Sequence, residues 1–422
     1  MANTILTMGV IAKAGLAILE NELTTTKFVN REYDSTFKQS MNGYLPGQTI
    51  NVRKPARYIG RNGANQSVEG FQETSVPISL TQQPGVDMTF SSIDLTLNIA
   101  DFSERVLKPA ISNIANQIDY GVNSLFNTVP NVVGVPGQTP NQLLTFLQAK
   151  ALLDNKLASK ADRSAILDPY AEAYMVDSLK GLFNPTAEVS EQYKRGTMGM
   201  AGGFKFSMDQ NVQRATIGAG AGTTGTVTGG SQTGSSIVTG GWAASTLIFN
   251  TGDIVTFAGV QSVNYQSRQA QGVLQQFVIT APVTSTAGGA ATLPIYPPLN
   301  PANSGTQSIV QQATVNTSPA GGASVYVWGA ASAAGTPISG ATAGVSTTQN
   351  LVFQKDAFTL ACADLPLPGG VDMAARASDD QLGLSIRIIR QYAIATDTWA
   401  TRLDVLCGWA ALRPELAVRV CG

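Results

Sequence analysis

The chain has 422 residues, which is enough for two or three domains with a large buried core. Its 27 basic and 28 acidic side chains nearly balance, so it lacks the basic excess that non-specific nucleic-acid binding requires. It contains no histidine, which excludes Ser-His-Asp and Cys-His catalysis and imidazole metal sites. Most hydrolase classes are therefore excluded.

Three cysteines, Cys362, Cys407 and Cys421, lie near the C-terminal end without a Cys-x-x-Cys pair. This odd, clustered set predicts neither a zinc site nor a disulfide framework, and it fits a reducing compartment. No apolar stretch reaches the ~18 residues of a membrane-spanning helix, and no signal peptide is recognisable. We expect no cofactor, no bound metal and no membrane association.

The first segment, residues 1–46, is interpreted as an N-terminal arm. Apolar residues recur at helical spacing over residues 4–23, and an irregular polar stretch follows over residues 24–41. The sequence therefore predicts one amphipathic helix and then a chain without regular structure.

Residues 47–98 predict an extended loop with flanking strands. Extended segments at 49–59 and 76–80 lie on either side of a Gly-rich tip at Gly60–Gly63, and residues 88–97 read as a further strand. The pattern is typical of a long two-stranded excursion.

Basic side chains gather on the outgoing arm of this excursion and acidic ones on the return. They are Arg53, Lys54, Arg57 and Arg61, followed by Glu69 and Glu73. Charges on a projecting ribbon can pair with complementary charges on another subunit. A solvated surface gives the same pattern, so both interpretations stay open, and these six residues are our candidate inter-subunit contact.

Residues 99–162 predict two helices. In the first, capped by Asp101 or Ser103, apolar residues recur at spacings of three and four from Leu107 to Leu125, and Pro109 should kink or restart it. The second starts with Thr139 as N-cap, Pro140 at its first position and Gln142 completing a capping box, and it runs to about Ser159.

Two further segments predict mixed structure. Residues 163–217 contain a short strand at 164–167 and a third helix from Asp168 to Phe183. Residues 350–422 contain late strands at 384–394 and 402–412.

The segment between them, residues 218–349, differs in composition. From residue 215 to residue 354 only Asp253 and Arg268 are charged, and half of the 42 glycines lie here. Strand patterns nevertheless recur, which predicts an inserted all-β domain with close ends rather than disorder. We expect its Gly/Thr-rich start, residues 218–241, to be flexible. The expected core is Ile254, Phe257, Val260, Phe277, Ile279 and Trp328.

Motifs for enzyme chemistry are weak. Gly220–Gly225 satisfies GxGxxG, but no helix follows it, so we interpret it as part of a linker. The acid pairs Asp379–Asp380 and Glu188 with Glu191 are typical of solvated loops. We expect no enzyme activity and no catalytic residues, with a carboxylate-dependent enzyme as a remote alternative.

Several motifs occur in an order that is typical of one family. Gly252–Val260 looks like a GD-x-hydrophobic-x-FAGV start of an inserted domain, and Leu274–Thr280, Leu293–Pro298 and Leu403–Trp409 followed by Arg413-Pro414-Glu415 are similar in kind. In these motifs and in its order of parts, the chain resembles the major capsid (coat) proteins of tailed double-stranded DNA bacteriophages. It resembles specifically the podovirus type that carries an inserted β domain.

The resemblance implies an α+β fold, the tailed-phage capsid (Johnson) fold, plus an inserted all-β barrel-like domain. It assigns 99–162 to the spine helix and peripheral domain, 163–217 to the first part of the axial domain, and 350–422 to the second axial/peripheral part. It implies self-assembly as hexamers and pentamers into an icosahedral head that encloses double-stranded DNA without sequence-specific binding.

The same resemblance implies scaffolding and portal proteins as partners, assembly in the bacterial host cytoplasm and a final location in the virion. A Gly/Thr-rich adhesin or tail structural protein is the alternative. Such a protein would show internal repeats and a trimeric β pattern in place of three capped helices.

Overall fold

The computed structural model describes residues 8–33, 37, 49–55, 64, 74–91, 106–178, 199–302, 313–328, 342–378 and 384–422. Within these ranges the chain forms both helices and many strands, which confirms the α+β class. It divides into two compact units, each assembled from separated segments. The first unit contains residues 1–52, 76–122 and 358–412, and the second contains 53–75, 123–357 and 413–422.

The boundary after Val122 falls inside the segment 99–162, to which the resemblance assigns the spine helix and the peripheral domain. The first predicted helix belongs to the first unit, whereas the second predicted helix belongs to the second unit. The two helices are therefore separated, because the second one packs on strands that come later in the chain.

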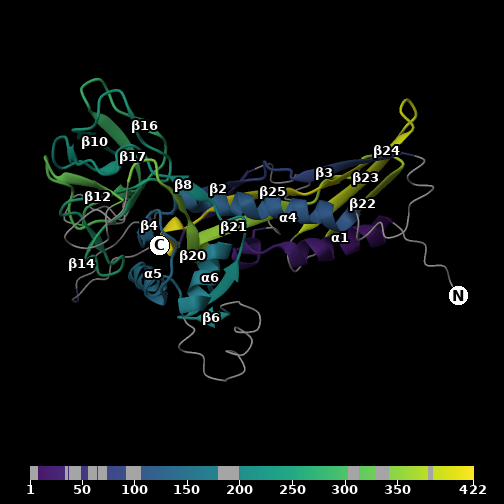
Figure 1. Ribbon diagram of the computed structural model, residues 1–422, viewed down its shortest axis with the longest axis horizontal. Coiled ribbons are helices and arrows are strands. Elements are labelled where there is room, and N and C mark those ends of the chain that lie inside the picture. Colours follow the sequence, from purple (N-terminus) through teal and green to yellow (C-terminus); the bar gives the residue numbers. More distant parts are fainter. Residues whose placement is uncertain are drawn as a thin grey trace. The chain divides into compact units, whose positions relative to one another are not determined.

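The first unit is built on a four-stranded antiparallel sheet with the order β22-β23-β24-β3. Helix α1 packs on β22 and β23, and Figure 1 shows α1 and α4 running alongside the sheet. The bounds are α1 (Met8–Glu22), β3 (Gly85–Ser91), α4 (Lys108–Asn123), β22 (Met373–Ser378), β23 (Ser385–Ala393) and β24 (Thr398–Asp404). The predicted strand at 384–394 is confirmed.

Helix α4 buries the apolar stripe that its spacing predicts. Ile111, Ile114 and Ile118 are fully buried, and Val122 is nearly so. Pro109 is the second residue of the helix, so its missing N–H falls in the first turn, where no intrahelical bond is lost. The α-helix begins at Lys108, directly after the π-helical residues Val106 and Leu107, which fits the expected restart at Pro109.

A buried carboxylate joins α4 to the segment after α1. Asp119 accepts hydrogen bonds from the backbone N–H of Thr24 at 2.7 Å and of Thr26 at 2.9 Å, and also from the Thr26 hydroxyl. These donors satisfy a charge that would otherwise be costly to bury. The polar stretch after α1 is thus held at this point, where a short 3₁₀ helix, η1 (Thr25–Phe28), forms.

Two small antiparallel sheets complete the described part of the first unit. They pair β1 with β2, and β21 with β25. Their bounds are β1 (Thr49–Arg53), β2 (Ser75–Ser79), β21 (Phe358–Ala363) and β25 (Leu406–Ala411). The single strand predicted at 402–412 is in fact the end of β24 and then β25. The predicted tip Gly60–Gly63 and the caps Asp101 and Ser103 lie outside the described residues.

The second unit contains a six-stranded mixed sheet with the order β4-β26-β20-β5-β7-β6. Helix α5 packs on β26, β4 and β20, and α6 packs on β5. The bounds are β4 (Asn131–Val133), α5 (Leu143–Asn155), β5 (Arg163–Leu167), α6 (Pro169–Ser178), β6 (Met200–Ala201), β7 (Phe204–Met208), β20 (Asn350–Gln354) and β26 (Ala417–Val420), with 3₁₀ helices η3 (Ser124–Thr128), η5 (Lys355–Ala357) and η6 (Pro414–Leu416).

The prediction that Thr139 caps the second helix is wrong. Helix α5 begins at Leu143 with Gln142 at the N-cap position, and it has no side-chain cap. The preceding residues are used elsewhere, because the carbonyl of Gln138 accepts a hydrogen bond from the N–H of Gly422 at 3.0 Å. Tertiary pairing therefore delays the helix despite a favourable capping sequence. The predicted end of α6 at Phe183 lies outside the described residues.

The inserted segment forms a closed barrel of six strands, ordered β10-β17-β15-β12-β18-β9, which confirms the barrel-like domain. Its strands are β9 (Gly225–Val227), β10 (Gly234–Gly240), β12 (Ile254–Phe257), β15 (Phe277–Ile279), β17 (Ala291–Leu299) and β18 (Ser324–Val327). Three strand pairs accompany it: β8 (Arg214–Thr216) with β19 (Ser346–Thr348), β11 (Leu247–Phe249) with β16 (Val283–Thr284), and β13 (Gln261–Val263) with β14 (Ala270–Leu274).

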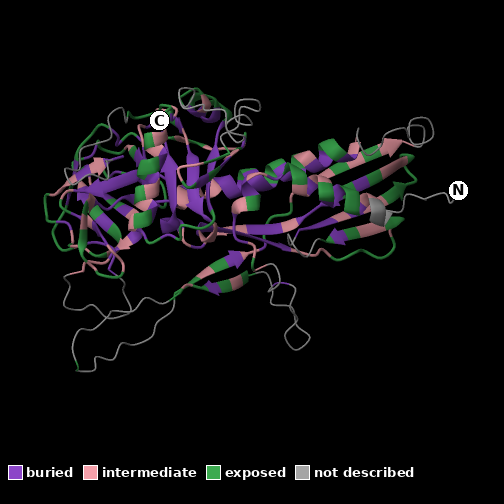
Figure 2. Ribbon diagram, turned by 90° about the horizontal axis from the view of Figure 1, so that it is seen from below, coloured by how far each residue is buried: buried purple, intermediate pink, exposed green. Residues whose placement is uncertain are grey.

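The barrel core contains the residues that the sequence predicts. All six expected core side chains, including Trp328, are fully buried in one cluster, and Figure 2 shows the barrel strands largely in the colour for buried residues. The two ends of the insertion lie together, because Thr216 of β8 pairs with Ser346 of β19. Both the expected core and the expected closeness of the ends are confirmed.

The prediction of a flexible start at residues 218–241 is wrong. Strands β9 and β10 lie in this segment, and both are members of the barrel. Gly225, the last glycine of the GxGxxG motif, packs directly on the indole of Trp242, where a Cβ would clash. Glycine is therefore required here for close packing and not for mobility.

Candidate functional site: the root of the inserted barrel

The barrel joins the six-stranded sheet through a buried polar cluster that we call the barrel root. It consists of Phe126, Asp253, Trp328, Gln349 and Arg419. Four of these side chains are almost completely inaccessible to solvent, and Phe126 is 5% exposed. They come from η3, the barrel, the link between β19 and β20, and β26, which are all parts of the second unit.

Arg419 is the centre of the root. Its strand, β26, runs between β4 and β20, and the side chain is fully buried. Nη2 donates to the carbonyl of Gly252 at 2.7 Å, and Nη1 donates to Oε1 of Gln349 at 3.3 Å. One guanidinium therefore contacts both the turn before β12 and the end of the inserted segment.

The guanidinium also contacts two aromatic rings. It lies 5.2 Å from the ring centroid of Trp328 and 5.9 Å from that of Phe126. Such cation–π contacts compensate part of the cost of removing the charge from water. Burial lowers the pKa of Arg419 to about 10, so the side chain remains protonated at neutral pH.

Asp253 lies close by without an ion pair to the arginine. Its Oδ1 accepts from the indole Nε1 of Trp328 at 3.1 Å, and its Oδ2 accepts from the backbone N–H of Asn250 at 2.7 Å and of Gly218 at 3.1 Å. Burial nevertheless raises the pKa of Asp253 above its ordinary value. One carboxylate thus fixes the start of the insertion, the turn before β12 and the end of β18.

Gln276 forms a second connection to the sheet. Its side-chain Oε1 accepts from the N–H of Val132 at 2.9 Å, and its Nε2 donates to the carbonyl of the same residue at 3.0 Å. The amide therefore replaces a neighbouring strand at the outer edge of β4. Because Val132 also belongs to the apolar cluster of the barrel, the barrel and sheet cores are continuous.

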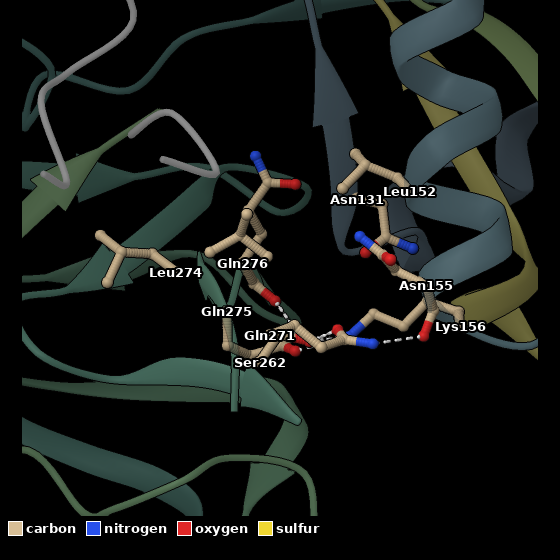
Figure 3. A pocket seen from close by; sticks show the side chains of 10 residues that line it. Asn131, Leu152, Asn155, Lys156, Ser262, Gln271, Leu274, Gln275 and Gln276 are labelled. Atoms are coloured by element: carbon tan, nitrogen blue, oxygen red, sulfur yellow. Dashed lines mark hydrogen bonds between the residues drawn. The ribbon is translucent and has the colours of Figure 1, made fainter. Parts of the chain in front are cut away.

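Lys156, at the end of α5, forms the third connection (Figure 3). Its Nζ donates to Oγ of Ser262 at 2.8 Å and to Oε1 of Gln275 at 2.7 Å, and it lies 5.2 Å from the ring centroid of Tyr265. The cavity beside it measures ≈ 10 Å³, about the space for one water. It is a filled contact surface and not a ligand pocket.

None of the five root side chains carries a hydroxyl or thiol, and their contacts are hydrogen bonds and ring packing. Among the described residues there is also no cluster of cysteine or acidic side chains that could hold a metal ion. The acid pairs considered from the sequence, Asp379–Asp380 and Glu188 with Glu191, lie outside the described residues. The contacts of the root join the barrel to the six-stranded sheet.

Of the six predicted contact residues, the structure describes two. Arg53 is exposed at the end of β1, and Lys54 follows it with its backbone N–H bonded to the carbonyl of Thr74 at 2.7 Å. Arg57, Arg61, Glu69 and Glu73 lie outside the described residues. The proposed inter-subunit role of this cluster remains a prediction.

Sequence reasoning did not find the root. One signal was available for each charged member: Arg419 stands alone in an apolar strand, and Asp253 is the only acid of the insertion. A lone charge in an apolar environment is usually buried with partners. The identity of those partners depends on the tertiary fold, so the spacing along the chain could not reveal them.

The described residues thus form a closed barrel fixed to a six-stranded mixed sheet. The sequence matches the family model described as P22 coat protein - gene protein 5 over residues 24–422. The chain belongs to this coat protein family. Its role is structural, in a phage capsid, and the adhesin or tail-protein alternative is not favoured.

Several solved structures are similar to this chain at low sequence identity. That of Mycobacterium phage Che8 is 10% identical, with 94% of this chain and 90% of that chain covered and a TM-score of 0.44. The capsid of Ralstonia phage GP4 is 7% identical, with 94% and 87% covered and a TM-score of 0.44. No protein with a curated description matches the chain. The family assignment rests on the sequence match and not on these TM-scores.

Membrane insertion through helices is not indicated, because no helix among the described residues is both long enough and apolar enough to span a bilayer.

Proposed function

We propose that this chain is the major subunit of an icosahedral phage head, assembled as hexamers and pentamers around double-stranded DNA. The observation that supports this most strongly is the coat-family match over nearly the whole chain. A near-neutral charge balance agrees with it, since many copies can pack without strong mutual repulsion and without tight binding to the enclosed DNA. The protein works by self-association and not as an enzyme.

The proposal includes partners that the family resemblance implies. A scaffolding protein guides assembly in the host cytoplasm, and a portal protein occupies one vertex. The barrel root supports a subunit of this kind, because it holds the inserted domain in one position on the six-stranded sheet. A repeated shell contact needs such a fixed geometry.

Expression followed by electron microscopy tests the proposal. The chain is produced alone and together with the scaffolding protein of the same phage, and the particles are separated by sedimentation. We expect closed shells of uniform diameter in at least one of the two preparations. Soluble subunits that form no shell in either preparation would contradict the proposed function.

The basic and acidic groups of the extended loop are proposed as a contact between subunits. Reversing Arg53 and Lys54 to Glu should leave the circular dichroism of the subunit unchanged and reduce shell yield, most strongly at low salt where the charges are least screened. Reversal of Lys160, which is exposed beyond α5, is the matched control. A shell yield at low salt equal to that of the wild type would support the alternative, in which the loop charges only face solvent.

A further inference from the structure

Two of the three cysteines lie directly opposite each other on neighbouring strands. Strand β21 runs antiparallel beside β25 (Figure 1), and their register pairs Cys362 with Cys407. Both side chains are fully buried, and both belong to the first unit. Opposite residues of an antiparallel pair carry their side chains on the same face of the sheet, so the two thiols are neighbours.

The backbone hydrogen bonds show which type of antiparallel pair this is. The N–H of Cys407 donates to the carbonyl of Gln82 at 2.9 Å, and its C=O accepts from the N–H of the same residue at 3.1 Å. Both backbone groups of a strand residue point to the same side, so those of Cys407 point away from β21. Cys362 and Cys407 therefore form a non-hydrogen-bonded pair.

The other strand leads to the same conclusion. Leu360, two residues before Cys362, donates its N–H to the carbonyl of Asn30 at 3.1 Å, so its backbone points away from β25. Strand residues alternate in direction, so the backbone of Cys362 does the same. In such a pair the Cα atoms lie about 4.5 Å apart, within the range of roughly 4.4–6.8 Å that disulfides span. A bond between the two sulfur atoms therefore needs little movement of the backbone.

We propose that Cys362 and Cys407 are an oxidation site, at which a disulfide joins β21 to β25. This bond closes a loop that contains β22, β23 and β24, three of the four strands of the sheet in the first unit. A disulfide that closes a long loop stabilises a protein chiefly by restricting the unfolded chain. The oxidised first unit is therefore more resistant to unfolding than the reduced one.

A small peroxide supplies the oxidising equivalents. The thiolate of one cysteine attacks hydrogen peroxide, the O–O bond breaks, and a sulfenic acid forms, while the released hydroxide takes up the proton of that thiol. The second sulfur then attacks the sulfenic sulfur, the S–O bond breaks, and the oxygen leaves as water with the proton of the second thiol. Two thiols and one peroxide thus give one disulfide and two waters.

Burial makes this reaction slow. Burial, and next the neighbouring Cys362, raise the pKa of the Cys407 thiol well above its usual value, whereas the charge of Arg31 acts in the opposite direction. The pair therefore stays reduced wherever thiol buffers are present. Coat subunits made in a reducing cytoplasm end in particles outside the cell, and this change of surroundings is the only step that rests on the proposed function.

Peptide mapping of the full chain tests the bond. The reduced subunit is incubated with hydrogen peroxide, the remaining thiols are alkylated in urea, and the digest is analysed by mass spectrometry without reductant. We expect the peptides of Cys362 and Cys407 to be joined within one chain in most molecules. Cys421, a buried thiol of the second unit, is the internal control and should be recovered alkylated.

Hydrogen exchange in the same buffer supplies the time scale. Oxidation is followed until the amides of β21 and β25 have exchanged, so that the strands have opened in every molecule. Recovery of Cys362 and Cys407 as two alkylated thiols at that time would overturn the inference, as would a bond from either of them to Cys421 or to a second chain. Because the measurement uses unassembled subunits, either result leaves the proposed function unaffected.

Two alanine variants separate the disulfide from other effects of peroxide. Oxidation should raise the midpoint of thermal unfolding of the wild-type subunit by about 5 °C, and dithiothreitol should reverse the increase. Cys421→Ala should keep this increase, whereas Cys362→Ala should lose it. An equal increase in Cys362→Ala would show that the stabilisation does not come from this bond and would contradict the inference.

Discussion

The two units differ in whether an arginine and a nearby buried aspartate form a direct ion pair. In the four-stranded sheet of the first unit, Arg387 donates from Nε and Nη2 to the two carboxylate oxygens of Asp404, at 2.9 and 2.6 Å. In the barrel root of the second unit, Arg419 and Asp253 are both buried, yet their hydrogen bonds go to neutral groups: Asp253 accepts from the indole of Trp328, and Arg419 donates to the carbonyl of Gly252, while the Nε of Arg419 has no hydrogen-bond partner among the described residues.

The difference shows what each arrangement holds together. The Arg387–Asp404 pair joins neighbouring strands β23 and β24, which backbone hydrogen bonds already connect. Arg419 joins β26 to the turn before β12, which belongs to the barrel, and to Gln349 at the end of the insertion, directly before β20. The first pair adds to an existing strand pair, whereas the contact of Arg419 with Gly252 connects β26 to the barrel, whose described strands do not pair with β26.

The largest effect is therefore expected at Arg419. Arg419→Met fills much of the same volume but leaves the Gly252 carbonyl and the Gln349 amide without their donor, and it should lower the free energy of unfolding by about 3 kcal/mol or more. Urea denaturation of the subunit measures the loss. Arg419→Lys should recover only part of it, because an ammonium cannot make the same planar contacts.

Arg214→Met is the matched control for this substitution. Arg214 is exposed on β8 of the same unit, and its replacement should change stability by about 0.5 kcal/mol or less. Equal losses for Arg214→Met and Arg419→Met would remove the special role of the root.

The next effect is expected at Gln276, the side chain that closes the edge of β4. Gln276→Leu leaves the N–H and C=O of Val132 unpaired in a buried site, which should cost about 2 kcal/mol. The exposed Gln269→Leu is the control and should be nearly neutral. The comparison is made by thermal unfolding, and a neutral Gln276→Leu would mean that the barrel does not depend on this edge contact.

A smaller loss is expected in the four-stranded sheet. Arg387→Met should cost about 1–2 kcal/mol, because Asp404 keeps a hydrogen bond from Nε2 of Gln83 at 2.6 Å. A double-mutant cycle with Asp404→Asn should give a clear coupling energy, since the two residues touch directly. The absence of coupling would contradict the direct pair that distinguishes this sheet from the root.

The smallest effect is a pH dependence at Asp253. Burial raises its pKa above the ordinary 3.8 in the folded chain, so its contribution to stability is full below about pH 4 and is lost as pH rises through the raised pKa. Asparagine does not titrate. The stability advantage of the wild type over Asp253→Asn should therefore shrink as the pH rises above about 4 in urea titrations. An advantage that grows with pH would show that the charged form is the stabilising one.

The sequence was sufficient to predict an element where a local apolar pattern is also the part of that element that is buried. The apolar spacing of α4 and the short strands around Ile254, Phe277 and Trp328 predicted elements that the structure contains. It failed where distant residues compete with local preference. Thr139 has the chemistry of a helix cap, but the neighbouring Gln138 pairs with Gly422, and Gly225 in the Gly/Thr-rich start packs closely on Trp242.

Native-state hydrogen exchange of the full chain tests most directly whether the root makes the barrel and the six-stranded sheet one cooperative body. We expect amides of the barrel strands β12, β15 and β18 and of the sheet strands β20 and β26 to exchange with a common free energy of opening. In Arg419→Met the barrel amides should exchange from a separate, less stable opening. A wild-type barrel that opens independently of the sheet, with no change in Arg419→Met, would contradict this account.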